Sequence, residues 1–89
     1  KLSPENISEQ LQSLSGWTLN GNAIRKQFQF EDFIAAMTFV GRVAELAEEA
    51  NHHPDIDIRY NKVLLALSTH DAGGLTNKDF DLAARIEQL

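Results

Sequence analysis

Cysteine is absent from this chain, and tryptophan, tyrosine and methionine occur once each. The lack of cysteine excludes disulfides, thiolate nucleophiles and zinc–thiolate sites, although it does not decide the compartment. The three histidines are therefore the only side chains that ordinarily titrate near neutral pH. Two are adjacent, at His52 and His53, and the third, His70, follows an alternating apolar run. Any acid–base chemistry is expected at these positions.

Positive charge and long hydrophobic runs are also scarce. Lys and Arg number 8 against 13 Asp and Glu, which gives a formal net charge of −5. Affinity for a phosphate backbone needs clustered Lys and Arg, so we expect no direct nucleic-acid binding. No stretch approaches the roughly 20 apolar residues that cross a bilayer, so no membrane insertion is expected. We expect a cytoplasmic protein, and organellar import stays open because a segment before Lys1 can have been removed.

The length and composition are those of one globular domain. The 89 residues are 43% hydrophobic and 24% charged, which is ordinary for a folded protein. A domain of this size buries only about 60 to 65% of its unfolded surface, so association with further copies stabilises it. We therefore predict a single domain over residues 1–89 that forms a homodimer or a homotetramer.

The first third of the chain predicts a helix followed by a β-hairpin. Ser3-Pro4 is a helix start, with Ser3 as the cap and Pro4 in the first helical position, and Gly16 is the predicted stop. Residues 17–19 and 23–30 follow as two strands. Asn20-Gly21 between them favours a type I′ turn, because both residues tolerate a positive φ angle.

The remainder predicts a long helix, a second hairpin and a last helix. Apolar residues recur at helical spacing over 31–51, and strict alternation marks strands at 56–60 and 63–69 around a turn at Asn61-Lys62. Thr76 begins the last helix as part of a capping box. The order α-β-β-α-β-β-α predicts an α+β fold, in which a four-stranded antiparallel sheet has three helices packed on one face.

His52 and His53 lie where Pro54 stops the long helix, and they allow two interpretations. As cations at a helix C-terminus they would stabilise the helix by about 0.3 to 1 kcal/mol and have no further role. Alternatively, one of them points into a site, since adjacent side chains cannot share a direction. If the last turn stays helical, Glu48 lies one turn before His52 and can orient its imidazole.

His70 and Asp79 are open to two interpretations as well. His70 precedes residues 71–74, a glycine-containing loop predicted to be flexible, and it is either a site residue or a loop histidine without a role. Asp79 stands three residues after Thr76, where an acid is expected as a capping partner whatever the chemistry. Spacing alone favours the capping interpretation of Asp79.

Acid–base catalysis by imidazole is the chemistry that these residues favour. The histidine spacing matches no metal motif, because an adjacent pair lacks the i, i+4 geometry of helical ligands, so no metal site is expected. Ser68 and Thr69 stand near His70 without the glycine pattern of a nucleophile elbow. General acid–base catalysis is therefore the favoured chemistry, and the residue types do not identify its substrate.

A set of motifs in the second half of the chain closely resembles the pterin-4a-carbinolamine dehydratase family. It consists of Glu48-x-x-x-His52-His53-Pro54, Tyr60-Asn61-Lys62-Val63 and Leu67-Ser68-Thr69-His70-Asp71, followed by Gly74-Leu75-Thr76 and Asp79. The similarity extends over the whole chain, because the family has the same order of elements. One departure is Ile56, where some members have an aromatic residue, and the stacking or shape role of that side chain is in doubt here.

The resemblance implies a hydro-lyase, a 4a-hydroxytetrahydrobiopterin dehydratase. It would remove water from the pterin-4a-carbinolamine to give quinonoid dihydropterin, in recycling the cofactor of aromatic amino acid hydroxylases, without a metal or other cofactor. The matching positions imply catalytic, substrate-binding and orienting residues. These are His52, His53, His70 and Asp79 for catalysis, Pro54, Thr69, Asp71 and Ala72 for substrate binding, and Glu48 for orientation.

A rival function is that of an interaction module without physiological turnover. Some animal members of the family also bind a homeodomain transcription factor as a dimerisation cofactor, and the helices of this acidic chain could serve such a partner. A role in another pterin-linked pathway would use the same site. Nothing in the sequence selects the interaction role, the sequence cannot separate the other pterin-linked pathway, and the physiological pterin stays open.

Overall fold

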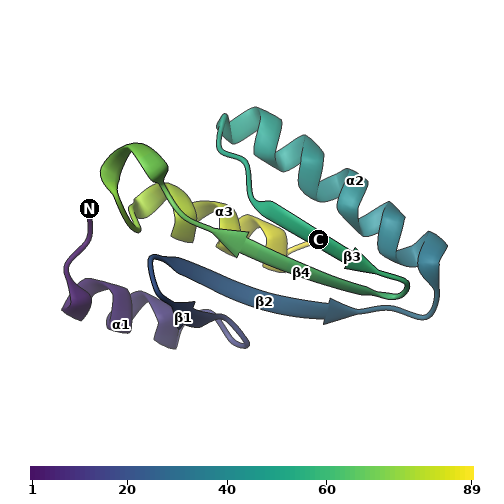
Figure 1. Cartoon of the computed structure of the whole chain (residues 1–89), viewed down its shortest axis with the longest axis horizontal. Helices are drawn as coiled ribbons and strands as arrows, with labels where there is room; N and C mark the ends of the chain where they lie inside the picture. Colours follow the sequence, from purple (N-terminus) through teal and green to yellow (C-terminus); the bar gives the residue numbers. More distant parts are fainter.

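The computed structural model describes all 89 residues and consists of three α-helices and one four-stranded sheet (Figure 1). The helices are α1 (Pro4–Gln12), α2 (Phe33–Ala50) and α3 (Asn77–Glu87). The strands are β1 (Thr18–Asn20), β2 (Ala23–Gln29), β3 (Asp55–Arg59) and β4 (Lys62–Leu67), and a short 3₁₀ turn, η1 (His70–Ala72), follows β4. The predicted order of helices and strands is confirmed.

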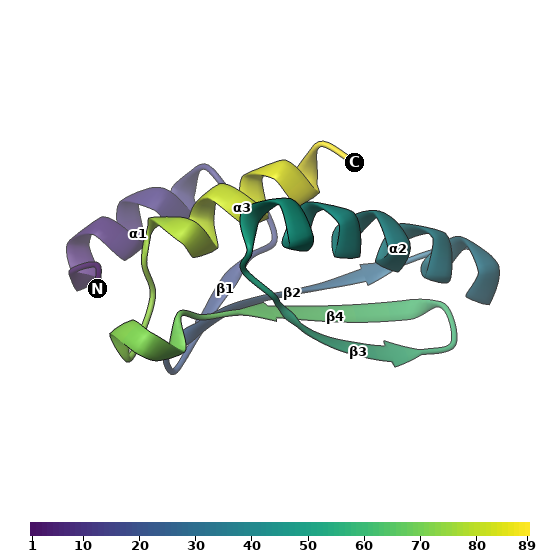
Figure 2. The same ribbon diagram turned by 90° about the horizontal axis from the view of Figure 1, so that it is seen from above.

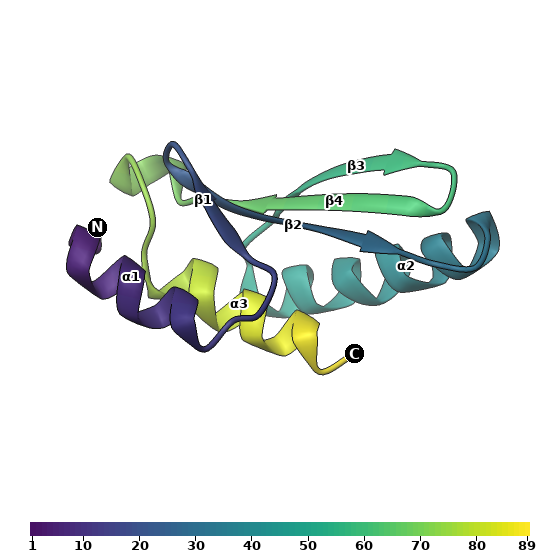
Figure 3. The same cartoon turned by 90° about the horizontal axis from the view of Figure 1, so that it is seen from below.

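Neighbouring strands of the sheet are all antiparallel, in the order β1-β2-β4-β3. The two hairpins therefore meet at the central strands β2 and β4, while β1 and β3 form the edges. All three helices lie on one face of the sheet, as Figures 2 and 3 show from above and from below. The predicted α+β fold, with helices on a single face of a four-stranded antiparallel sheet, is confirmed.

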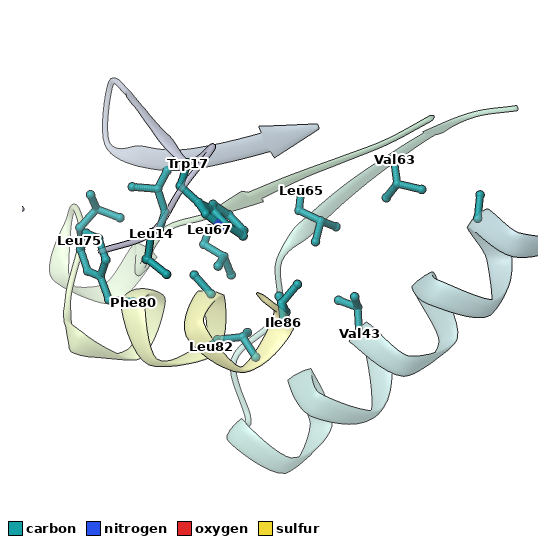
Figure 4. Close-up of a cluster of buried hydrophobic side chains, with 13 residues drawn as sticks. Leu14, Trp17, Val43, Val63, Leu65, Leu67, Leu75, Phe80, Leu82 and Ile86 are labelled. Atoms are coloured by element: carbon teal, nitrogen blue, oxygen red, sulfur yellow. The ribbon is translucent and has the colours of Figure 1, made fainter. Parts of the chain in front are cut away.

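The core fills the space between the sheet and the helices (Figure 4). Alternation along β4 turns Val63, Leu65 and Leu67 toward the helices, and all three are fully buried. The other core residues come from the segment before β1, from β2, from α2 and from residues 75–86: Leu14, Trp17, Ile24, Ala36, Val43, Leu75, Phe80, Leu82, Ala83 and Ile86. Burial of one large apolar side chain contributes about 1.5 to 3 kcal/mol, so this layer holds the helices to the sheet.

The first helix is shorter than predicted. Ser3 caps its start, as expected, but the helix ends at Gln12 with Ser13 as its cap, well before Gly16. Leu14 leaves the helical path and is buried in the core, with 7% of its surface exposed. The apolar pattern of the sequence extends beyond the helix because its last apolar residue, Leu14, is buried from a loop.

Both predicted hairpins form, but the turn of the first differs. Asn20 pairs with Ala23, which leaves Gly21 and Asn22 as the turn residues. Gly21 has a φ of 61°, and Asn22 has no positive φ. A type I′ turn needs a positive φ at both positions, so the predicted type I′ turn at Asn20-Gly21 is wrong. The signs fit a type II′ turn, which takes glycine first.

The turn of the second hairpin lies one residue earlier than predicted. Arg59 pairs with Lys62, so the turn residues are Tyr60 and Asn61. The carbonyl of Asn61 accepts a hydrogen bond from the Phe30 amide at 2.8 Å, and its side-chain amide donates to the Phe30 carbonyl at 2.9 Å. These two bonds hold Asn61 in the turn, and Tyr60 takes a positive φ of 54° that is uncommon outside glycine.

The segment after β4 is a hydrogen-bonded turn. The predicted strand 63–69 ends at Leu67, and residues 71–74, predicted as a flexible loop, follow in a closed turn. Thr69 and Gly74 exchange backbone hydrogen bonds of 3.1 and 3.3 Å across this turn. The two bonds close the chain around η1 and fix the place of its first residue, His70.

The wide apolar face of α2 is only partly covered. Val43 is buried beneath the helix, whereas three large apolar side chains in its N-terminal half are 47%, 76% and 39% exposed: Phe33, Ile34 and Met37. The edge strand β3 adds Ile56 and Ile58, at 38% and 36%. None of the helices, α2 included, combines the length and the apolar character needed to cross a bilayer.

Candidate active site

A polar cleft lies where the end of α2, the end of β4 and the start of α3 meet. Figure 1 shows these ends of the two helices and of the strand in the same half of the molecule. The cleft has a volume of about 360 Å³ and no hydrophobic residue in its lining. Its lining residues are Asn51, His52, His53, Ser68, Thr69, His70, Asp71 and Lys78. All three histidines of the chain therefore surround one cavity, although they come from two distant segments.

His52 is anchored by a buried carboxylate. Its Nε2 lies 2.5 Å from Oδ1 of Asp79. The side chain of Asp79 is fully buried, and that of His52 is 11% exposed. A buried carboxylate is stable only when its oxygens are hydrogen-bonded, so Asp79 needs this contact as much as His52 does. The imidazole of His52 is consequently held in one orientation.

Asp79 serves the helix and the histidine at once. Its Oδ2 accepts a hydrogen bond from the Thr76 amide at 2.9 Å, which is half of the predicted capping box. The same oxygen accepts a second hydrogen bond from the hydroxyl of Thr69, also at 2.9 Å. The opposite oxygen, Oδ1, contacts His52. Asp79 is therefore both a helix-capping residue and the partner of a cleft histidine.

The hydrogen bonds around Asp79 have a definite direction. Thr69 donates its only hydroxyl hydrogen to Asp79, so the 2.8 Å contact between the two threonine hydroxyls must be donated by Thr76. An ionised carboxylate can only accept, so Nε2 of His52 donates to Asp79. Nδ1 of His52 takes part in no hydrogen bond within the chain, and in this tautomer it carries the lone pair.

His53 is held by a second carboxylate at the surface. Its Nε2 lies 2.6 Å from Oε2 of Glu48, and the two side chains are 57% and 77% exposed. This corrects the expectation that Glu48 orients His52. Asn51 ends α2 in the left-handed conformation, and the His52 amide returns to the Ala47 carbonyl at 3.0 Å. His52 thereby leaves the helical path, and the next residue comes to lie over Glu48.

Only some of the other predicted site residues line the cleft. His70 and Asp71 line it, and both are exposed. Ala72 lines an adjacent hollow of about 410 Å³ and not the cleft itself. Pro54 is partly buried and is not part of either lining. Thr69 lines the cleft, but its hydroxyl hydrogen is committed to Asp79.

Three lining residues had no place among the candidates from the sequence. Asn51 and Ser68 each stand one or two residues from a histidine, and that proximity in sequence was a usable signal. Lys78 is next to Asp79, yet nothing in the spacing shows which side chain of a helical first turn faces the histidines. Only the placement of α3 against the end of β4 reveals Lys78.

The cleft brings together side chains that can exchange protons. The structure contains no group of three or more His, Asp or Glu side chains placed to hold a metal ion. It does place an anchored imidazole, His52, and an imidazole without an intramolecular partner, His70, around the same cavity. Imidazoles can give or take a proton near neutral pH, so this arrangement suits general acid–base chemistry.

Comparison with known proteins assigns the chain to a family. The family model described as "Pterin 4 alpha carbinolamine dehydratase" matches residues 1–89. The chain belongs to the pterin-4a-carbinolamine dehydratase family. The resemblance carried by the histidine motifs and by Asp79 is thereby confirmed. The histidines of the motifs that carried the resemblance line the cleft, and Asp79 contacts His52.

Relatives from bacteria and archaea are similar over their whole length. A protein of Acidobacterium capsulatum is 62% identical over 89 residues, which cover 100% of this chain and 97% of that protein. A protein of Sulfurisphaera tokodaii is 48% identical, with 100% and 96% covered. Both carry the provisional name pterin-4-alpha-carbinolamine dehydratase. The relatives are thus named for a dehydratase.

Two solved structures share the fold. The transcriptional coactivator/pterin dehydratase from Brucella melitensis has a TM-score of 0.94 at 34% identity, with 99% of this chain and 96% of that chain covered. A pterin dehydratase-like protein, identified as a RuBisCO assembly factor in the alpha-carboxysome, has a TM-score of 0.66 at 23% identity, with 81% and 83% covered. The second likeness concerns the fold alone.

Proposed function

We propose that this chain removes water from a 4a-hydroxytetrahydropterin to give a quinonoid dihydropterin. The bond between carbon 4a and its hydroxyl breaks, and the lone pair of the neighbouring ring nitrogen forms a C=N bond. The hydroxyl takes up a proton and leaves as water, while the ring nitrogen releases a proton, so no oxidant or reductant is consumed. The physiological place of this step would be the recycling of a pterin cofactor of aromatic amino acid hydroxylases.

His52 is assigned the role of general base. Its Nε2 is bound to Asp79, so Nδ1 is the nitrogen with a lone pair and without an intramolecular partner. When Nδ1 takes the proton from the ring nitrogen, the imidazole becomes a cation, and the adjacent carboxylate of Asp79 stabilises it. A fixed imidazole next to a buried anion is well suited to remove a proton during the reaction.

His70 is assigned the role of general acid. It comes from η1 rather than from the end of α2, so it approaches the cleft from a different segment, and no residue of the chain holds its imidazole. An imidazole that is free to reach the departing hydroxyl can protonate it as the C–O bond breaks. His53, with its exposed partner Glu48, is assigned a contact to the pterin ring.

The observation that carries this proposal is the convergence of the three histidines on one polar cleft, with Asp79 beneath one of them. The direct test is dehydration of a synthetic 4a-hydroxytetrahydropterin by the purified chain, followed by absorbance as the quinonoid product forms. Loss of water also proceeds slowly without a catalyst, so the protein-free rate is measured alongside. A rate equal to that background at micromolar protein would contradict the proposal.

A homodimer or homotetramer is proposed as the working form. Support comes from the small size of the domain and from the exposed apolar side chains of α2 and β3, among them Ile34 at 76%. Sedimentation should show a dimer or a tetramer, and Ile34→Glu should shift it toward the monomer. Gln12→Glu on α1 adds the same charge elsewhere and should leave the mass unchanged. A wild-type monomer at micromolar concentration would contradict the proposal.

A second candidate function is that of a protein-interaction module. It is favoured by the same exposed side chains of α2, Phe33, Ile34 and Met37, because apolar surface of this kind suits a helical partner. Affinity capture with the histidine-cleft variants would separate the two functions. A partner retained by variants that have lost turnover would favour the module, whereas turnover without any captured partner would favour the enzyme.

A further inference from the structure

The face of the sheet that points away from the helices has no covering layer (Figures 2 and 3). The buried residues of β4 point toward the helices, so its alternate residues and their pairing partners point to the open face. A hollow of about 280 Å³ lies there, lined by residues of β2, β3 and β4: Arg25, Gln27, Asp57, Arg59, Lys62 and Leu64. We call it the open-face hollow, and none of its residues lines the histidine cleft.

The open-face hollow is cationic, although the chain as a whole is acidic. It brings together three of the eight Lys and Arg residues and one carboxylate, that of Asp57. Asp55, at another outward position of β3, adds a second carboxylate to this face. The rest of the chain holds 5 Lys and Arg residues against 11 Asp and Glu residues. Positive charge is thus concentrated on the face that no helix covers.

Two of these cations lie directly opposite each other. Arg59 pairs with Lys62 across β3 and β4, and like charges at opposite positions of a sheet are destabilising. Asp57 accepts a hydrogen bond from Nε of Arg59 at 3.2 Å, but these two side chains are 47% and 82% exposed, so the contact contributes little. The terminal nitrogens of Arg59 keep their donors for a further acceptor. An anion bound between Arg59 and Lys62 would offset the repulsion.

We propose that the open-face hollow docks an extended acidic segment of another protein. The guanidinium groups of Arg25 and Arg59 present parallel N–H donors that match a carboxylate, and Lys62 adds a positive charge. The row of Gln27 lies between those of Arg25 and Lys62, and its amide can both donate to and accept from a peptide backbone. This inference does not depend on the proposed function, because it concerns other residues on another face of the molecule.

The extent of the surface suits an extended chain. An adjoining hollow of about 230 Å³ shares Arg25, Gln27 and Leu64 with the open-face hollow and continues to Thr18 of β1. The two hollows together reach across all four strands. Neighbouring strands lie about 4.8 Å apart, so this width is about 14 Å, which about four extended residues span. Lys26 in the adjoining hollow is already paired with Glu87 at 2.8 Å. The segment is therefore left to the three cations of the open-face hollow.

Other classes of ligand fit this face less well. Sites for small molecules are concave and mostly apolar, whereas Leu64 is the one apolar residue of the open-face hollow. Single-stranded nucleic acid binds by stacking its bases on aromatic side chains, and the outward positions of the four strands contain none. A peptide rich in carboxylates needs neither an enclosed apolar pocket nor an aromatic surface.

The experiment measures the binding of a fluorescein-labelled peptide in which four glutamates alternate with four glycines. A matched peptide with glutamine in place of glutamate is the control probe, and fluorescence anisotropy gives the dissociation constants at about 50 and 200 mM salt. The proteins are the wild type, Arg25→Gln, Arg59→Gln, Lys62→Gln, the triple variant and the control Arg42→Gln. Arg42 is an exposed residue of α2 that lines neither hollow, so its substitution removes the same charge away from the open face.

The wild type should bind the glutamate peptide about tenfold or more tightly than the glutamine peptide, and less tightly at the higher salt concentration. Each single substitution in the open-face hollow should weaken binding about twofold to fivefold, the effect of losing one exposed ion pair. The triple variant should lose about tenfold or more, and Arg42→Gln should bind as the wild type does. Thermal unfolding should show that every variant is folded, so that a loss of binding is not a loss of structure.

Five results would overturn the proposal. Absence of binding at about millimolar peptide, or an equal loss in Arg42→Gln, would show that the open-face hollow is not a docking site. Tighter binding of an oligothymidylate of the same charge would make the partner a nucleic acid. Displacement of the peptide by an equal concentration of tripolyphosphate would make the ligand a small anion. A smaller species of the triple variant in sedimentation would make the hollow an interface between copies of this chain.

Discussion

Two histidine–carboxylate pairs lie next to each other in this chain and differ almost only in burial. His52 and Asp79 are 2.5 Å apart, and His53 and Glu48 are 2.6 Å apart. The first pair is 11% and 0% exposed, the second 57% and 77%. Water competes for every hydrogen bond of the exposed pair, which contributes about 0 to 1 kcal/mol. Water has much less access to the buried pair, and its carboxylate is tied to further hydrogen bonds.

The comparison shows that the length of the histidine–carboxylate contact does not tell how firmly each histidine is oriented. Asp79 is joined to the fold through Thr76 and Thr69, so the orientation of His52 is decided by the packing of α3 against the end of β4. The carboxylate of Glu48 has no hydrogen bond within the chain besides the one to His53, so the orientation of that pair depends on two exposed side chains. We therefore assign the proposed proton transfer to the buried pair and the proposed substrate contact to the exposed pair.

The largest effect on turnover is expected when His52 and His53 are replaced one at a time. His52→Ala should lower kcat by about 10² to 10⁴, the usual contribution of a positioned acid or base. His53→Ala should mainly raise KM, because the role proposed for its imidazole is to contact the pterin without moving a proton. Steady-state kinetics of both variants would show the split. Equal losses of kcat in the two variants would break the comparison.

Asp79→Asn is the next test, because asparagine keeps the shape and removes the charge. Its amide can donate to Nε2 of His52 and so place the hydrogen on Nδ1, which takes the lone pair away from the proposed base. We expect kcat to fall about 10- to 1000-fold, within the loss known for a catalytic histidine left in the wrong tautomer. Denaturant unfolding should show a loss of about 0.5 to 2 kcal/mol from the weakened cap. Lower stability with unchanged kcat would reduce Asp79 to a helix cap.

Thr69→Val should have a smaller effect on the same pair. The valine removes the hydroxyl that donates to Asp79 and leaves Thr76 without its acceptor, while it keeps a similar volume. The hydrogen bond to the carboxylate contributes about 1.5 kcal/mol or more to stability, so the midpoint of urea unfolding should drop measurably. The kcat should fall about threefold to tenfold, because Asp79 is held less firmly in position. Thr69→Ser restores the hydroxyl and should recover both values, and its failure to do so would mean that volume, not hydrogen bonding, is what Thr69 supplies.

The smallest effect is expected from Glu48→Gln. The glutamine can still hydrogen-bond His53, and the exposed pair contributes at most about 1 kcal/mol. Turnover should stay within about twofold of the wild type, and thermal unfolding should be almost unchanged. A loss as large as that of Asp79→Asn would show that the exposed pair, and not the buried one, controls the site.

Much of the fold was predictable because burial follows simple periods. The alternation of Val63, Leu65 and Leu67 gave the core face of β4, and the capping box at Thr76 placed the start of α3. The turns were less predictable, since the turn at Gly21-Asn22 and the position of Asn61 depend on pairing across the sheet. Local residue preference could not supply that pairing.

Only some members of the candidate site were predictable, and its contacts were not. The motif identified the three histidines and Asp79, and the structure places them around and beneath one cleft. The partner of Glu48 was missed because it depends on how α2 ends. The left-handed conformation of Asn51 takes the following residues off the helical path. Lys78 was missed because its proximity to the histidines arises only when α3 is packed.

The most direct test of the account is single-turnover dehydration of a 4a-hydroxytetrahydropterin across about pH 5 to 8, where imidazole ordinarily changes its charge. It compares the wild type with His52→Ala, with His70→Ala and with the double variant, against the protein-free rate. We predict that each single variant loses about 10² to 10⁴ in rate and that the double variant falls close to the protein-free rate. Wild-type rates in both single variants throughout this pH range would contradict the claim that the histidines of the cleft transfer the protons.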